Sequence, residues 1–258
     1  MTLLDPTPLD LAHAKMEQSD AARLQFYERL ADAELFLLLE AEPEGDQITP
    51  RLFPVEDATL VLAFDREERL ADFAGSAPYA AVSGRVLAQM LAAQSLGLGL
   101  NLEVAPSSIV LPSEAIIWLH DTLGAAPKDV EATPEELLPP TGLPEALITG
   151  LDTKLALTAG LARHAYLCGV RYAGGGQSHM LAFLDPVPGA EGALAHAVNE
   201  ALVFSGIEAG SLDVAFFNVS DPLAAELAKV GLRFDLPELA APDGPSAPGM
   251  DPSKPPVL

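Results

Sequence analysis

The sequence is poor in basic residues for its length of 258 residues. Lysine and arginine number 14 against 37 aspartates and glutamates, so the formal net charge is -23 at pH 7. A field of this sign repels the phosphates of DNA and RNA and the headgroups of anionic membranes, so we expect no partner of either kind. A basic protein would be attracted. However, a high net charge can also simply keep a protein soluble, because like-charged molecules resist association. The charge therefore selects no particular partner, and the oligomeric state stays open.

Cysteine is almost absent as well. Cys168 is the only one, so no intrachain disulfide can form, which is typical of a reducing compartment. The first residues lack the basic start and apolar core of a signal peptide. Apolar runs such as Leu35 to Leu39 are far shorter than the ~20 residues that cross a bilayer. We therefore expect a cytoplasmic protein.

Aromatic residues make up only 6% of the chain while hydrophobic residues make up 49%, so the core must be built mainly from Leu, Val and Ala. Apolar residues recur at helical spacing over residues 8–32 and 83–96. The apolar run 58–64 predicts a central strand, and the alternation over residues 100–104 predicts another. We interpret residues 7–123 as one lobe with helices packed on a mixed sheet.

The composition changes after this lobe. Five prolines fall within residues 124–144, so we predict an extended linker that forms neither a helix interior nor a central strand. Residues 145–236 alternate helical and strand patterns and predict a second lobe with a mixed sheet. Residues 237–258 are rich in Pro, Ala, Gly and Asp and predict a disordered tail. The expected fold class is α+β, or mixed α/β, in two small lobes.

Two glycine-rich segments resemble ligand-binding loops only in part. Gly174-Gly175-Gly176 lacks the Lys and Ser or Thr that a phosphate loop needs, and strand patterns on both sides predict a hairpin turn. Gly97-Leu98-Gly99 precedes a strand pattern, so it does not fit a dinucleotide fingerprint, and we expect it to end the preceding helix. No Gly-x-Ser-x-Gly nucleophile elbow occurs.

Histidine and cysteine offer one weak enzymatic hypothesis. There is no Cys-x-x-Cys and no zinc-helix spacing among the five histidines, His13, His120, His164, His179 and His196. Cys168 and His164 share a strand pattern but are four residues apart, roughly 13 Å at ~3.3 Å per residue. His179 on the next strand could approach Cys168, although a single buried cysteine usually acts as a small apolar side chain.

Acidic clusters provide no convincing site either. A carboxylate pair for acid–base catalysis needs one shielded member with a raised pKa, and the clusters lie in segments that we expect to be solvated. No EF-hand spacing occurs. We therefore assign no catalytic, cofactor-binding or metal-binding residue and predict that the protein is not an enzyme. The clusters comprise Glu42, Glu44, Asp46, Glu131, Glu135 and Glu136.

Several segments resemble the SseB family, named for enhanced serine sensitivity. Phe26-Tyr27-Glu28-Arg29-Leu30, Pro50-Arg51-Leu52-Phe53 and the Ser-x-Ile-Val-Leu-Pro ending at Pro112 resemble its N-terminal domain. Arg163-His164-Ala165-Tyr166-Leu167 and Gly231-Leu232-Arg233-Phe234 resemble its C-terminal domain, within residues 147–236. The resemblance implies a bacterial cytosolic protein from a family with no established enzymatic activity, so no catalytic residue is carried over.

Two functions follow as hypotheses. The first is a non-catalytic protein-interaction or regulatory protein with an unidentified protein partner. The alternative is a module that binds a small molecule of amino-acid type in the cleft between the lobes, because interdomain clefts commonly hold ligands and the family name mentions serine. A deep interlobe pocket with converging polar groups would favour the alternative, and a flat exposed apolar patch would favour the first.

Overall fold

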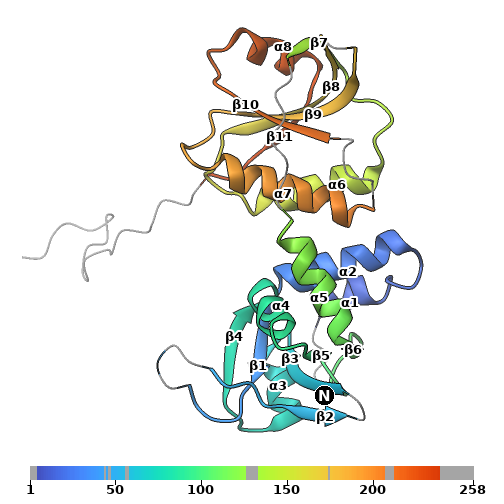
Figure 1. The fold of residues 1–258 in the computed structure, drawn as a ribbon, viewed down its shortest axis with the longest axis vertical. Coiled ribbons are helices and arrows are strands. Elements are labelled where there is room, and N and C mark those ends of the chain that lie inside the picture. Colours follow the sequence, from blue (N-terminus) through green and yellow to red (C-terminus); the bar gives the residue numbers. More distant parts are fainter. Residues whose placement is uncertain are drawn as a thin grey trace, which may run out of the picture.

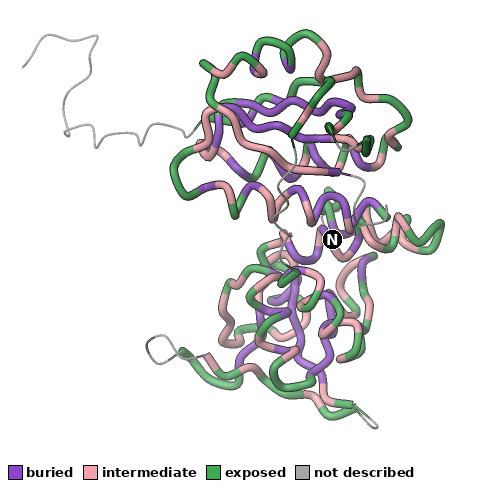
Figure 2. The backbone as a smooth tube through the Cα atoms, turned by 45° about the horizontal axis from the view of Figure 1, so that its top comes forward, coloured by how far each residue is buried: buried purple, intermediate pink, exposed green. Residues whose placement is uncertain are grey.

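The computed structural model describes residues 5–238 except 44, 46, 47, 56, 57, 126–132, 174 and 207–211. The chain forms two lobes stacked along the long axis of the molecule, and helices from both lobes lie between the two sheets (Figure 1). Buried backbone runs through both sheets and continues into the helices at the junction (Figure 2). The α+β fold in two lobes is confirmed.

The N-terminal lobe is built on a mixed sheet with strand order β4-β1-β3-β5-β6, and β2 also pairs with β3. Strand β3 lies at its centre, antiparallel to β1 and parallel to β5. Helices α2, α4 and α5 cover one face, and α3 covers the other. The elements are α1 (Pro8–His13), α2 (Asp20–Asp32), β1 (Glu34–Leu38), β2 (Phe53–Val55), β3 (Ala58–Phe64), α3 (Glu67–Ala74), β4 (Tyr79–Ser83), α4 (Gly84–Ala92), β5 (Gly97–Leu100), β6 (Ile109–Leu111) and α5 (Ser113–Leu123).

The C-terminal lobe has a second mixed sheet with strand order β10-β9-β8-β11, and β7 pairs with the other end of β8. Helices α6 and α7 cover the face toward the N-terminal lobe, and α8 covers the opposite face (Figure 1). The elements are β7 (Pro134–Leu138), α6 (Glu145–Ala156), β8 (His164–Tyr172), β9 (Gln177–Leu184), α7 (Glu191–Phe204), β10 (Leu212–Phe217), α8 (Pro222–Val230) and β11 (Leu232–Asp235).

The expected end of the helix at Gly97 and Gly99 is wrong. Helix α4 ends at Ala92, both glycines belong to strand β5, and residues 101–104 form a turn instead of a strand. The reason is tertiary packing. A Cβ atom at Gly97 would lie 2.6 Å from Leu60 Cδ2, and one at Gly99 would lie 2.5 Å from a methyl group of Leu62. The glycines make room for leucines of the neighbouring strand.

The predicted linker over residues 124–144 also needs correction. Residues Pro134–Leu138 form strand β7, which pairs with β8, so part of this segment belongs to the C-terminal sheet. Proline is tolerated there because the strand is short and lies at an edge, where a missing N–H donor costs little. Of the predicted tail over residues 237–258, residues 239–258 lie outside the described residues.

Candidate functional site

The two lobes meet through helices. Helix α2 of the N-terminal lobe contacts α7 of the C-terminal lobe, and α5 contacts α7 as well. Trp118 on α5 stands between the lobes, with its ring centroid 5.1 Å from that of Tyr27 and 6.5 Å from that of Phe204. Phe204 belongs to α7 but packs into the N-terminal core. The junction is therefore a packed interface, and it contains the charged groups described next.

Lys154 lies at the centre of a buried ion cluster. This lysine belongs to α6, its side chain is only 2% exposed, and its ammonium meets carboxylates from both lobes. Lys154 Nζ lies 2.5 Å from Asp32 Oδ2, 3.1 Å from Glu200 Oε2 and 3.6 Å from Glu28 Oε1. Asp32 and Glu28 come from α2 and Glu200 from α7, so a single ammonium links three helices.

Arg85 closes the cluster from helix α4. Its guanidinium donates to both oxygens of Glu200, at 2.5 and 2.7 Å, and to Asp32 Oδ1 at 2.6 Å. His196 lies one turn before Glu200 on α7, with Nε2 3.1 Å from Glu200 Oε1. We call Glu28, Asp32, Arg85, Lys154, His196 and Glu200 the interlobe ion cluster. Every carboxylate in it faces at least one cation from the other lobe.

The cluster leaves one oxygen without a hydrogen bond. Glu28 Oε1 is buried, and within the described part of the chain it has no hydrogen-bond partner. Lys154 Nζ at 3.6 Å is close enough for attraction but too far for a hydrogen bond. Three carboxylates face two permanent cations, so the cluster carries one unbalanced negative charge when His196 is neutral. Glu28 is thus the least satisfied member.

The pKa values within the cluster separate in opposite directions. Burial raises the pKa of Glu28, and the charges of Lys154 and Arg29 offset this only in part. Burial also opposes ionisation of Glu200, but hydrogen bonds from Arg85 and the charge of Lys154 outweigh it and lower its pKa. Two similar carboxylates at one interface therefore differ in how strongly they hold a proton.

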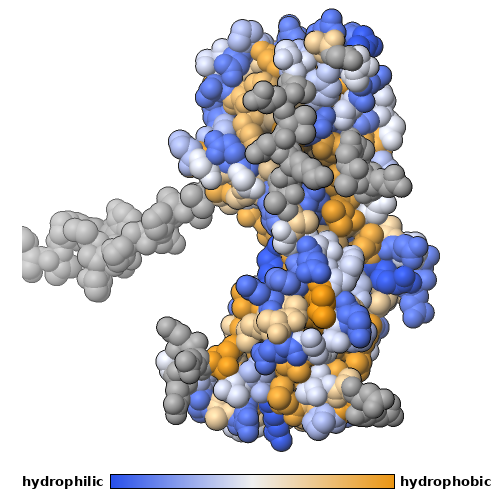
Figure 3. Space-filling view, in the orientation of Figure 1, coloured by the Kyte–Doolittle hydropathy of each residue, from blue (hydrophilic) through white to orange (hydrophobic). Residues whose placement is uncertain are grey.

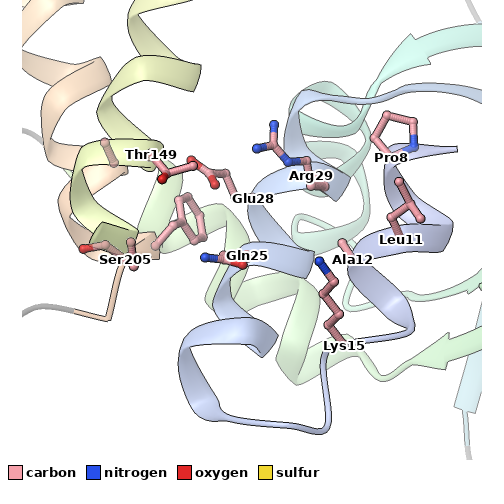
Figure 4. A pocket seen from close by; sticks show the side chains of 13 residues that line it. Pro8, Leu11, Ala12, Lys15, Gln25, Glu28, Arg29, Thr149 and Ser205 are labelled. Atoms are coloured by element: carbon pink, nitrogen blue, oxygen red, sulfur yellow. The ribbon is translucent and has the colours of Figure 1, made fainter. Parts of the chain in front are cut away.

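A cavity of about 240 Å³ opens beside Glu28, between the lobes. It is lined by helices α1 and α2 on one side and by α6 and α7 on the other. Figure 4 shows the Glu28 side chain extending across the gap toward the helix that carries Thr149. The lining residues are Pro8, Leu11, Ala12, Lys15, Gln25, Glu28, Arg29, Ala146, Thr149, Gly150, Ala201, Phe204 and Ser205.

The cavity wall carries both signs of charge. Arg29 follows Glu28 on α2, is half-buried, and donates only a long bond of 3.4 Å to Thr153 Oγ1. Lys15 is exposed in the turn that follows α1. Within the described residues neither Arg29 nor Lys15 forms an ion pair. A carboxylate and two cations that form no ion pair within the described part of the chain therefore line the same small cavity.

A second buried ion pair fixes helix α1 as a wall of this cavity. Asp10 on α1 accepts two hydrogen bonds from Arg69, at 2.5 and 3.1 Å, and another from Ser107 Oγ at 2.5 Å. Burial opposes ionisation of Asp10, but these bonds outweigh it and hold its pKa well below the ordinary value. Arg69 also bonds Asp65 at 2.7 Å. This network is fully paired and has a structural role.

The structure separates the two residues of the enzymatic hypothesis. Cys168 pairs across the hairpin with Met180, and His179 pairs with Gly169, so the two side chains point to opposite faces of the sheet. Cys168 is fully buried, and burial raises the pKa of its thiol to about 11. His179 Nε2 instead lies 3.0 Å from the carbonyl oxygen of Thr141. This geometry does not favour a thiolate–imidazole pair.

The other segments singled out in the sequence play structural parts where they are described. Gly175 has a φ of 85° and lies in the hairpin turn between β8 and β9, as expected. Glu136 forms an exposed ion pair with Arg171. Glu44, Asp46 and Glu131, which belong to the acidic clusters, lie outside the described residues.

Sequence reasoning missed the interlobe ion cluster, although a local signal was present. Lys154 stands on the same helix face as Leu147, Leu151 and Leu155, all of which are buried. A lysine is almost never fully buried unless it is paired, so its position on an apolar stripe indicates a buried partner. Glu28 shows the same signal beside Leu30 and Ala31. The identity of the partners has no such local signal.

On the face shown in Figure 3, hydrophobic and hydrophilic residues are interspersed over both lobes. Among the described residues, no group of three or more His, Cys, Asp or Glu side chains is arranged to hold a metal ion. In the same part of the chain, no helix is both long enough and apolar enough to cross a membrane.

Comparison with known proteins adds a family to this geometry. Residues 10–118 match the model of the SseB protein N-terminal domain. The match covers most of the N-terminal lobe, including helix α2 with Glu28 and helix α4 with Arg85. Comparisons with curated proteins and with solved structures found no match. Residues 10–118 therefore carry an SseB N-terminal domain, which supports membership of the SseB family.

Proposed function

We propose that this SseB-family protein is a non-catalytic, cytoplasmic binding protein that holds a small polar molecule between its lobes. One observation carries the proposal. The interlobe cavity is lined from both lobes and receives a buried carboxylate, that of Glu28, with an unsatisfied oxygen. A buried acceptor without a hydrogen bond costs about 1–3 kcal/mol, which a bound donor recovers.

A ligand in this position acts on the arrangement of the lobes. It contacts α1 and α2 on one side and α6 and α7 on the other, so it binds fully only when the lobes are docked. Its affinity for the docked form alone shifts the population toward that form. The proposed output is therefore regulatory: the ligand controls whether the two lobes present one rigid surface.

The protein-interaction hypothesis has less direct support as a primary function. Among the described residues, the most exposed large apolar side chains, such as Leu52, Leu157 and Val219, lie in separate connecting segments of both lobes. Singly exposed apolar residues are normal on monomeric proteins. We therefore propose that any protein partner recognises the docked lobes and does not occupy a preformed apolar patch.

Thermal unfolding of the full chain tests the binding function. A ligand at 100 times its dissociation constant adds about 2.7 kcal/mol, which corresponds to a rise in Tm of roughly 5–10 °C for a chain of this size. The probes are small polar metabolites of every charge class. If saturating concentrations of all classes leave Tm unchanged, the proposed function is wrong.

A further inference from the structure

We propose that the interlobe cavity binds a small zwitterion, with its ammonium group on Glu28 and its acidic group between Arg29 and Lys15. This inference rests on the proposed function and names the class of ligand. Three properties of the site support it: an unsatisfied acceptor, a charge imbalance of one unit, and two cations near Glu28 that form no ion pair within the described residues.

The unsatisfied acceptor selects a donor. The side chain of Glu28 is only 4% exposed, yet Oε1 has no hydrogen-bond partner within the described residues. Glu28 lines the cavity, so a ligand bound there that brings a donor to this carboxylate recovers the cost of the unsatisfied oxygen. A charged donor is the strongest choice, because hydrogen bonds between ions are roughly twice as strong as neutral ones. An ammonium group fits this requirement.

The charge imbalance of the cluster indicates how much positive charge the ligand brings to Glu28. The interlobe ion cluster holds the carboxylates of Glu28, Asp32 and Glu200 against the cations of Arg85 and Lys154. One positive charge therefore completes the balance. Lys154 Nζ already occupies the space between the three carboxylates, and His196 faces Glu200 from the α7 side. A monovalent group at Glu28 is what the arrangement lacks.

The two cations on the wall select an acidic group. A chain with 37 acidic and 14 basic residues repels anions in general, so an anion needs a local cluster of positive charge. Arg29 and Lys15 provide it beside Glu28, and within the described residues neither is engaged in an ion pair. A planar guanidinium suits a carboxylate particularly well. The ligand is thus cationic at one end and anionic at the other.

The volume keeps the ligand small. At about 240 Å³ the cavity is smaller than the pockets that hold drug-sized molecules, which measure roughly 300–1,000 Å³. Leu11, Ala201 and Phe204 supply an apolar part of the wall, so a short hydrocarbon portion is accommodated. A free amino acid, or a similar small amino acid derivative, has this combination of size and charge.

The test compares probes of equal size and different charge on the full-length protein. Norvaline is a zwitterion, pentylamine a cation, pentanoate an anion and 1-pentanol neutral, and each has five carbons. The common amino acids and their deaminated acids extend the series. We expect at least one zwitterion to raise Tm by roughly 5–10 °C at 100 times its dissociation constant, while its deaminated counterpart leaves Tm unchanged.

Two variants assign the ends of the ligand. Glu28→Gln keeps the shape of the side chain but removes its charge. We expect this variant to bind the zwitterion with an affinity lower by roughly 10- to 150-fold. Glu34→Gln makes the same chemical change at an exposed strand residue and should bind as the parent does. Arg29→Gln should lower the affinity for the zwitterion but leave the affinity for pentylamine unchanged, because pentylamine has no acidic group. Tm without ligand shows that each variant is folded.

The outcomes separate this inference from the proposed function. If compounds without an ammonium group stabilise the protein equally well, or if Glu28→Gln binds the zwitterion with unchanged affinity, the ligand class is wrong while the binding function stands. If no compound of any charge class changes Tm or Trp118 fluorescence, the ligand class and the binding function are both wrong. A zwitterion that depends on Glu28 and Arg29 supports both.

Discussion

Lys154 offers the sharpest test of how the lobes are held together. Replacing it with methionine keeps the length and volume of the side chain but removes the charge between Glu28, Asp32 and Glu200. Arg85 then remains as the one permanent cation against three carboxylates. We expect the lobes to stay folded, because each has its own sheet and buried clusters, and to lose their docked arrangement.

The expected magnitude follows from the distances. At an effective dielectric constant near 20, a pair of unit charges separated by 3.1 Å, as between Lys154 and Glu200, attracts by about 5 kcal/mol. Lys154 makes three such contacts, and burying its ammonium costs several kcal/mol. We therefore expect Lys154→Met to weaken docking by about 3–5 kcal/mol, or roughly a hundred- to four-thousand-fold.

Urea unfolding followed by two signals measures this loss. Trp118 fluorescence reports the contact between the lobes, and far-UV circular dichroism reports the helices and strands. In the variant the fluorescence transition should move to lower urea by more than about 1 M, ahead of the circular dichroism transition. Lys229→Met removes a charge from an exposed residue of α8 and is the matched control.

A partial rescue completes the test. Adding Glu28→Gln to Lys154→Met removes one of the three carboxylates, so the formal charge of the cluster returns to its original value. This double variant should recover part of the lost docking energy. If Lys154→Met and Lys229→Met unfold alike by both signals, the ion cluster does not hold the lobes together and the reasoning is refuted.

Three further predictions concern single residues. Without ligand, Glu28→Gln should stabilise the protein. Burial raises the pKa of Glu28 above its ordinary 4.5, so the parent protein loses stability as this carboxyl ionises with rising pH. Thermal unfolding should therefore show the gain in the variant at pH 7 and no gain near pH 4. Cys168, with a pKa of about 11, should react with iodoacetamide far more slowly than a free thiol at pH 8, and an equal or faster rate by mass spectrometry would contradict its buried position. Gly84→Ala should cost about 1–3 kcal/mol because its Cβ atom would lie 1.8 Å from the Leu30 carbonyl oxygen, whereas Gly192→Ala, with open space around it, should be neutral or stabilising in the same unfolding assay.

The central elements could be predicted because their burial leaves a local pattern. Strand β3 is buried along most of its length, which gives the continuous apolar run over residues 58–64. The hairpin of β8 and β9 was predicted from two apolar strands that flank glycines. In these cases the local pattern and the tertiary environment agree.

The errors arose where one local signal has two structural causes. Glycine after an apolar helix indicates a helix end. At positions 97 and 99, however, glycine is needed because a larger side chain would collide with Leu60 and Leu62 of the adjacent parallel strand. Proline over residues 134–138 suggested a linker, although a short edge strand tolerates it. Only the pairing of strands that are distant in the sequence distinguishes these alternatives.

The candidate site could be located from the sequence only in outline. A cleft between two lobes was one of the two hypotheses, and the structure has a cavity there. Its key residues were not identified, because Lys154 and Asp32 are separated by 122 positions and no local rule pairs them. Glu28 and Arg29 were noted only as part of a family-like segment.

The ion cluster also bears on how the chain is assembled during synthesis. Arg85 and Asp32 both belong to the N-terminal lobe, and Lys154 and Glu200 both belong to the C-terminal lobe, so each lobe has an ion pair of its own before the other is present. The emerging N-terminal lobe therefore exposes charged groups to water where its partner will later bind. Such a surface resists aggregation while the rest of the chain is still being made.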